Sequence, residues 1–277
     1  MSQTTYHDVR PSPIAGQWYP GQRDRLAQSV DGYLGARPPA EVAGRIIGLV
    51  VPHAGHMYSG PIAADAFRLV RGKTFRRVVV VSPMHSYLPQ ALLTSGHDAY
   101  ATPLGAVPID QETVEAIGER VKLARIRRDP EHALEIELPF LQRALAGEFS
   151  LVPIMVRDQT YAMAQKLGAA IGEAVSAEDT LLVASSDLSH FYTDSQARAL
   201  DPIMLGQIES FDPQGVIRVE DEGRAFACGR AAIAAVLVAA RALGANRATV
   251  VGYGTSGDTS GDRTRVVGYG AAALSQI

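Results

Sequence analysis

Short runs of hydrophobic residues alternate along this chain with longer segments in which hydrophobic residues recur every three or four positions. The short runs are rich in valine, isoleucine and leucine, which is typical of strands buried on both faces. The longer segments have the spacing of amphipathic helices. The pattern predicts strands at 46–51, 77–82, 91–95, 150–156, 180–186, 248–254 and 265–271, and helices at 22–35, 61–71, 111–121, 131–145, 160–175, 194–210 and 226–243.

Alternation of strands and helices is typical of an α/β protein in which helices cover a mainly parallel sheet. The chain has 277 residues and shows no internal repeat, low-complexity tract or linker-like segment that would divide it. We therefore expect residues 1–277 to form a single α/β domain.

Composition and charge narrow the functional classes. The 26 lysines and arginines are balanced by 29 acidic residues, so the chain lacks the basic excess of proteins that bind nucleic acids or anionic membranes.

One cysteine excludes an internal disulfide and fits a reducing compartment. The start of the chain has no signal-peptide pattern, and no segment approaches the roughly 20 apolar residues of a membrane span. We expect a cytoplasmic protein, with a homodimer possible because short apolar edge strands often pair.

Polar residues follow directly after four of the predicted strands. The carboxyl ends of parallel strands meet at one edge of a sheet, where ligands of α/β proteins bind. Residues that are distant in sequence could therefore converge there. These residues are His53, His85, Asp187, His190, Thr255, Ser256 and Asp258.

Imidazoles and carboxylates are ligands of iron, zinc, manganese and copper, and two histidines with one carboxylate form the oxygen-activating iron site. No short-spaced ligand motif is present, so the ligands of a metal site would be dispersed. Each residue also has a purely structural explanation: His53 and His85 could stabilise turns, and Asp187 or Ser189 could cap the helix that starts near Thr193.

Three further features leave alternatives open. His132 and Glu135 lie three residues apart on a predicted helix, where they could form a surface ion pair, orient a metal ligand or move a proton. The glycine-rich segment 256–262 lacks the lysine and the spacing of a phosphate-binding loop, which favours a turn-rich loop. Cys228 precedes a long apolar helix and is expected to be a small buried residue rather than a nucleophile.

Together these segments resemble the MEMO family. The resemblance runs from Arg10 to about Gly270 and is carried by "RPSPIAGQWYP", "VPHAGHMYSGPIAADAF", "VSPMHS", "EHALEIELPFLQ", "ASSDLSHF", "ACGRAAI" and "GYGTSGDTSGD" followed by "VVGYGA". It implies a three-layer α/β/α sandwich around a mainly parallel or mixed sheet, similar to class III extradiol ring-cleavage dioxygenases. It also implies a metal site.

The resemblance assigns roles to individual residues. His53 and His85 match the first two metal ligands, and His190 matches the acid–base histidine of the related dioxygenases, with His132 and Asp187 as further catalytic candidates. Some family members have a cysteine near the last strands. Here the matching position is Thr259, beside Asp258, so the third ligand stays open between Asp258, His190 and solvent.

His56 stands where the resemblance implies tyrosine, and it either adds a ligand or lines the cleft. We expect the substrate to be bound by residues of the same segments, namely His56, Ser59, Glu135, Thr255 and Thr259.

Three functions follow as hypotheses. The first is a metal-dependent redox or dioxygenase-like enzyme, with Fe(II) favoured over copper or zinc, acting on an unknown small-molecule or peptide substrate. Prokaryotic relatives accompany a radical-SAM protein and an AMMECR-type protein, which implies a modification pathway with such partners. The second is a non-catalytic module that binds metal or peptides, as animal relatives bind phosphotyrosine peptides. The third is metal-dependent hydrolysis with Glu135 or Asp187 positioning water.

Overall fold

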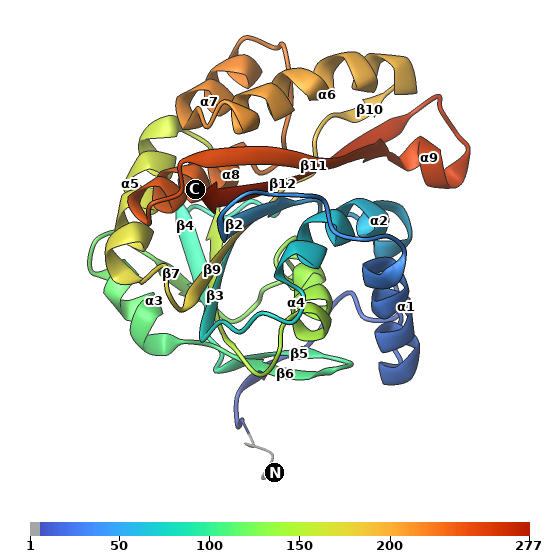
Figure 1. Ribbon diagram of the computed structural model, residues 1–277. Coiled ribbons are helices and arrows are strands. Elements are labelled where there is room, and N and C mark those ends of the chain that lie inside the picture. The colour runs from blue at the N-terminus through green and yellow to red at the C-terminus, as the bar shows by residue number, and fades with distance from the viewer. Residues whose placement is uncertain (1–5) are drawn as a thin grey trace.

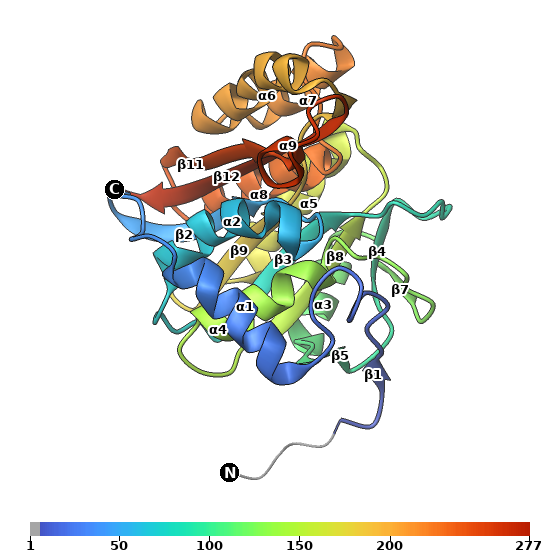
Figure 2. The same cartoon turned by 90° about the vertical axis from the view of Figure 1, so that its right-hand side faces the viewer.

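The protein is built on a large mixed β-sheet with helices packed on both of its faces (Figure 1 and Figure 2). The computed structural model describes residues 6–277. The expectation that no leader peptide is present rests partly on residues 1–5, which lie outside the described residues. Four neighbouring parallel strands form the centre of the sheet, in the order β2 (Arg45–Val51), β9 (Thr180–Ser185), β3 (Arg77–Pro83) and β8 (Ser150–Val156).

Antiparallel strands extend this centre on both sides. Beside β2 lies β12 (Val266–Gln276), which also pairs with β11 (Arg247–Thr255) and β10 (His190–Tyr192). Beside β8 lies β4 (Leu92–Ser95), which pairs in parallel with β7 (Ala124–Ile126) at the far edge. The sheet is therefore mixed, with its parallel strands in the middle.

Helices complete a three-layer α/β/α sandwich, as predicted (Figure 1). One layer holds α1 (Arg23–Gly35), α2 (His56–Phe67), which continues into the 3-10 turn η1 (Arg68–Val70), and α4 (Leu138–Ala144), which follows the 3-10 turn η2 (Glu135–Glu137). The other layer holds α3 (Gln111–Gly118), α5 (Tyr161–Ala174), α6 (Asp194–Glu209), α7 (Pro213–Asp221) and α8 (Arg230–Ala242). A small separate sheet contains β1 (Val9–Arg10), β5 (Ala99–Thr102) and β6 (Gly105–Pro108).

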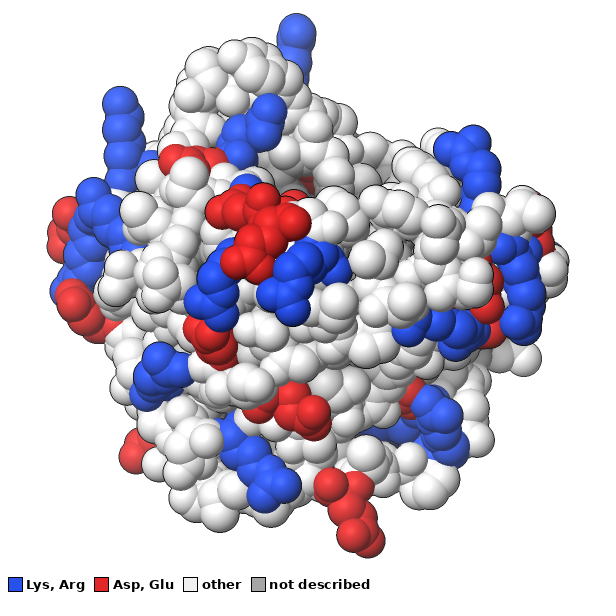
Figure 3. Space-filling view, turned by 90° about the horizontal axis from the view of Figure 1, so that it is seen from above, with Lys and Arg blue, Asp and Glu red and all other residues white. Residues whose placement is uncertain are grey.

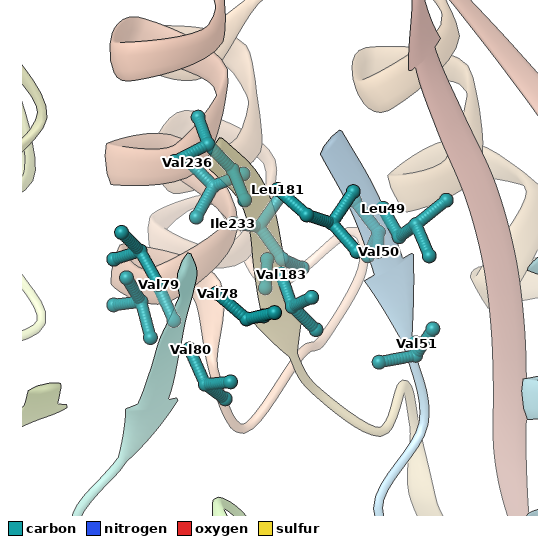
Figure 4. Close-up of a cluster of buried hydrophobic side chains, with 14 of the residues drawn as sticks. Leu49, Val50, Val51, Val78, Val79, Val80, Leu181, Val183, Ile233 and Val236 are labelled. Atoms are coloured by element: carbon teal, nitrogen blue, oxygen red, sulfur yellow. The ribbon is translucent and has the colours of Figure 1, made fainter. Parts of the chain in front are cut away.

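The central strands are buried on both faces because their sequences are almost continuously apolar. Figure 4 shows valines and leucines of β2, β3 and β9 packed beside Ile233 and Val236 of α8. Helix α5 approaches α8 so closely that a Cβ atom at Gly168 would lie 2.5 Å from the carbonyl oxygen of Ala235. Each fully buried Val, Leu or Ile contributes about 1.5–3 kcal/mol, so this core provides a rigid support for the loops at the sheet edge.

All seven predicted strands are present, and each predicted helical segment contains a helix, although most of these helices have different ends. The predicted helix 131–145 begins only at Glu135, because the carboxylate of Glu131 accepts hydrogen bonds from the backbone N–H groups of His132 and Ala133 and holds a turn there. The glycine-rich segment expected to be a loop contains a short helix, α9 (Ser256–Ser260), with a capping box between Thr255 and Asp258. The sequence pattern did not predict helix α7 or the short strands β1, β5, β6, β7 and β10.

Charged residues of both signs are interspersed on the face seen in Figure 3, in keeping with the balanced composition. Among the helices formed by residues 6–277, none is both long and apolar enough to cross a membrane.

Candidate metal centre

Three histidines from separate loops converge at the carboxyl edge of the parallel strands. His53 follows β2, His85 follows β3, and His132 lies in the loop before η2. One ligand atom of each lies within 4.8 Å of those of the other two. The ring centroids are 5.3 Å apart for His53 and His85, 5.5 Å for His53 and His132, and 4.7 Å for His85 and His132. These residues form a possible metal site.

The orientation of the His53 ring is fixed by a hydrogen bond between its Nδ1 and Ser185, the last residue of β9. The Ser185 hydroxyl donates to the carbonyl oxygen of Ala133 at 2.6 Å and lies 2.9 Å from His53 Nδ1. The same hydroxyl lies 2.9 Å from the carboxyl of Glu137, whose pKa is raised well above its usual range by burial, so that this group is protonated and can donate to Ser185. The single proton of the hydroxyl goes to the Ala133 carbonyl, which can only accept, and Ser185 therefore accepts from an N–H at His53 Nδ1. The neutral ring then carries its lone pair on Nε2, the nitrogen that is free to bind a metal.

Glu131 orients the other two histidines. One of its carboxylate oxygens lies 2.9 Å from His85 Nδ1 and 3.3 Å from His132 Nδ1. The carboxylate also accepts hydrogen bonds from the backbone N–H groups of both histidines, at 2.6 Å and 2.9 Å. A carboxylate behind ligating imidazoles is a common feature of metal sites, because it fixes the tautomer and makes the ligand more basic.

Burial favours the neutral, metal-binding form of two of the rings. Burial, reinforced by the neighbouring histidines, holds the pKa of His53 well below its usual range, and burial lowers the pKa of His132 to about 4. Burial also acts to lower the pKa of His85, but the hydrogen bond and negative charge of Glu131 outweigh it and raise that pKa. His53 and His132 are therefore neutral at neutral pH, whereas His85 holds its proton more strongly than a free imidazole.

The one cysteine of the chain adjoins this cluster. Cys228 lies just before α8, and its Sγ is 3.1 Å from His53 Nε2, the nitrogen identified above as the lone-pair carrier. Burial raises the pKa of the Cys228 thiol, so it is protonated unless a cation is nearby. A bound metal deprotonates a thiol that coordinates it. Three imidazoles with an adjacent thiol fit iron, copper or zinc.

A pocket of about 270 Å³ opens beside the cluster. Its lining includes Cys228, His190, and the aromatic rings of Tyr192 and Phe226, which stack with centroids 5.6 Å apart. The Nδ1 atom of His190 lies 2.8 Å from the carbonyl oxygen of Leu188, which makes Nδ1 the protonated nitrogen and leaves a lone pair on Nε2. Burial lowers the pKa of His190, so the ring is neutral and basic at pH 7.

A family model described as Memo-like protein matches residues 10–273. The chain belongs to the Memo family. Curated MEMO1 family proteins are similar over nearly the whole chain, with 33% identity in Nitrosopumilus maritimus, 34% in Aquifex aeolicus and 35% in Methanococcoides burtonii. These alignments cover 94–95% of this chain and 97–98% of the relatives.

Among solved structures, an uncharacterized protein from Escherichia coli K12 has a similar fold, with a TM-score of 0.52. The two chains are 14% identical, and the match covers 82% of this Memo-family chain and 99% of the other. At this identity the likeness concerns the fold alone.

The residues predicted near the last strands have other partners in the structure. Asp258 caps α9, where one carboxylate oxygen accepts the backbone N–H of Thr255 at 2.9 Å, and its other oxygen accepts from Arg198 at 2.6 Å. The hydroxyl of Thr255 donates to Asp194, and Thr259 is exposed on α9. The structure therefore does not bring Asp258 into the cluster, whose third histidine is His132.

Three residues expected to bind substrate are buried in the protein interior. His56 packs between Tyr19 and Phe140, and its Nε2 lies 3.0 Å from the carbonyl oxygen of Ile136. Ser59 is buried, and its hydroxyl donates to the carbonyl oxygen of Ala54. Glu135 is fully buried, where it pairs with Arg10 and accepts a hydrogen bond from Tyr19 at 2.6 Å. These contacts give all three residues structural partners.

Asp187 lies beside the cluster in a positioning role. Its carboxylate accepts the backbone N–H of His53 at 2.7 Å, and burial raises its pKa to about 7. The alternative explanation, that Asp187 or Ser189 caps the following helix, is wrong, because Thr193 forms that cap. Glu131 and Ser185 were not predicted as part of the site, and Cys228 was expected only to pack in the interior. Of the three, only Glu131 had a signal in the sequence, because it directly precedes His132.

Proposed function

We propose that His53, His85 and His132 hold a first-row transition metal, with Fe(II) favoured and copper or zinc as alternatives, and that this Memo-family chain is a metal-dependent oxidoreductase. The observation that supports it most is the convergence of three imidazoles, two of which are held at Nδ1 by hydrogen bonds, His53 by Ser185 and His85 by Glu131. A metal with open positions would supply a Lewis acid and, as iron or copper, a redox centre.

The residues around the cluster support proton transfer to or from a bound substrate. His190 is a neutral base, and its protonated Nδ1 is held by the carbonyl oxygen of Leu188. Its side chain shares the adjoining pocket with Cys228, whose sulfur adjoins His53. In this arrangement His190 accepts a proton from a substrate group and returns it later, as a general base and acid.

The size of the pocket favours a small substrate. A volume of about 270 Å³ lies just below the usual range of small-molecule sites, which is about 300–1,000 Å³, and the stacked rings of Tyr192 and Phe226 favour a planar or aromatic group. An extended peptide would contact this pocket with one side chain only. A peptide- or metal-binding module without catalysis is the alternative function.

The test measures oxygen consumption by the metal-stripped protein after anaerobic loading with Fe(II), Cu(I) or Zn(II). Small phenols, catechols and thiols are supplied as substrates. We expect uptake above the substrate-free rate with a redox-active metal, none with zinc, and a loss of uptake in His190→Gln with metal content unchanged. Stoichiometric metal binding without uptake for any compound, together with capture of a phosphotyrosine peptide, would favour the binding module.

The family resemblance also suggests a radical-SAM protein and an AMMECR-type protein as partners in one modification pathway. Co-purification with tagged versions of such proteins tests this expectation.

A further inference from the structure

A second pocket lies away from the histidine cluster, at the edge of the sheet formed by β4 and β7, and has a volume of about 320 Å³. In Figure 1 this edge lies on the left, beside α3 and α5. Its walls include Leu92 at the start of β4, Ala124 at the start of β7, Val121 from the preceding turn and Met163 from α5. These side chains provide an apolar interior of a size that small ligands occupy.

Two lysines, Lys122 and Lys166, line the same pocket from opposite elements, one in the turn after α3 and the other on α5. Their pairing is unusual for this chain, because only three of its 26 basic residues are lysines and the third is Lys73. Two of the three therefore line one pocket. An ammonium group is a compact, flexible point charge that suits a rounded anionic head group.

Two acidic side chains of the neighbouring helices are paired with arginines. On α3, Glu115 lies 3.6 Å from Arg125, and on α5, Glu173 binds Arg120 at 2.7 Å. Within residues 6–277, neither pocket lysine lies within 4.0 Å of a carboxylate. The two positive charges at this pocket are thus available to a ligand.

We propose that this pocket binds a small organic anion, with an apolar body inside and one carboxylate or phosphate head group held by Lys122 and Lys166. The combination of an apolar cavity with two uncompensated ammonium groups carries the inference. The proposal does not rest on the metal-dependent function proposed above.

The pocket is connected to the metal centre through one loop. Residues 89–91 form part of its wall, and they end the loop that starts at the candidate ligand His85. The backbone N–H of Arg157, directly after β8, binds the carbonyl oxygen of Ala91 at 2.9 Å and fixes this end of the loop. A ligand in the pocket therefore contacts the same loop that presents His85.

The test uses 8-anilinonaphthalene-1-sulfonate, a fluorescent anion with an apolar body, titrated into the metal-free full-length protein. We expect saturable binding at one site. Affinity should fall about tenfold or more in the double variant Lys122→Gln/Lys166→Gln, which loses two charge-assisted contacts, while Lys73→Gln, the matched lysine elsewhere, should bind as wild type. The single variants Lys122→Gln and Lys166→Gln serve if the double variant does not fold, each with a smaller loss.

Competition identifies the head group. Hexanoate or hexyl phosphate should displace the dye, and the competitor with the higher affinity shows whether the pocket prefers a carboxylate or a phosphate head group. Hexanol, which has the same apolar body without charge, should need about tenfold more or fail. Equal competition by hexanol, wild-type affinity in the lysine variants, or an equal loss in Lys73→Gln would overturn the proposal.

Discussion

Replacing Ser185 with alanine should weaken metal binding without touching a metal ligand. The Ser185 hydroxyl lies 2.9 Å from His53 Nδ1 and donates to the carbonyl oxygen of Ala133 at 2.6 Å, at a fully buried position. Without it, His53 is free to adopt the other tautomer, in which Nε2 carries the proton and cannot bind a metal. Loss of such an orienting contact lowers metal affinity about 10–100-fold, equivalent to about 1.4–2.8 kcal/mol.

The same change also destabilises the metal-free protein. It leaves the Nδ1–H of His53, the carbonyl oxygen of Ala133 and the carboxyl of Glu137 without their buried partner, and each such group costs about 1–3 kcal/mol, or about 3–9 kcal/mol together before any water enters. Ser275→Ala is the matched control, because the buried hydroxyl of Ser275 has no hydrogen-bond partner among residues 6–277. Its removal should change the free energy of unfolding very little.

Both quantities can be measured on the same samples. Trp18 is the only tryptophan of the chain, and its ring centroid lies 4.1 Å from that of His132, so its fluorescence should respond to metal binding. Affinity is then obtained from anaerobic titration in the presence of a competing chelator, and stability from urea unfolding of the metal-free protein. A folded Ser185→Ala protein that binds metal as tightly as wild type would refute the orienting role of Ser185.

Four further predictions follow from the same geometry. Cys228→Ser should keep three imidazoles but weaken binding of soft metals such as Cu(I) more than that of Zn(II), measured by chelator competition; equal effects on both metals would argue against a sulfur ligand. Glu131→Gln should lower metal affinity about 10–100-fold, because two of the histidines depend on this carboxylate, and unchanged affinity would contradict that. His190→Gln should retain the metal and lose only turnover, so loss of metal from this variant would reassign His190 as a ligand. Burial raises the pKa of the Asp187 carboxyl from 3.8 to about 7, so folding favours its protonated form. Its contribution to the free energy of unfolding, up to about 4 kcal/mol, is therefore present below pH 4 and is lost as the pH rises to 7. The difference in free energy of unfolding between metal-free wild type and Asp187→Asn should change with pH over this window, and a pH-independent difference would contradict the prediction.

The sequence predicted the central part of the fold because its strands are continuous runs of Val, Ile and Leu. Short elements such as β1, β7 and β10, with two or three residues each, are too short to produce a periodic signal and form only through pairing with distant strands. The short helix α9 was hidden in a glycine-rich segment because its stability comes from the Thr255–Asp258 cap rather than from helix-forming residues.

The candidate site could be predicted only where residues follow buried strands. His53 and His85 occupy such positions, so the sheet itself implies that they converge. His132 reaches the cluster from a long loop, and the position of that loop depends on the Glu131 carboxylate, a tertiary contact without a local sequence signal. Cys228 lies just before α8, within the segment whose apolar helix pattern indicated a packing role. Asp258 seemed suitable by its position after β11, but its carboxylate is directed to a helix cap and to Arg198.

The central claim, that three histidines hold one metal, is tested most directly by metal stoichiometry. The metal-stripped wild type and the variants His53→Ala, His85→Ala, His132→Ala and Asp258→Ala are incubated anaerobically with Fe(II), desalted and analysed for bound iron, with circular dichroism to establish that each is folded. We predict close to one iron per chain in the wild type and in Asp258→Ala, and loss of iron in each histidine variant. Iron retained by a folded His132→Ala, or lost from Asp258→Ala, would contradict the assignment of the third ligand, and iron retained by all variants would contradict the site itself.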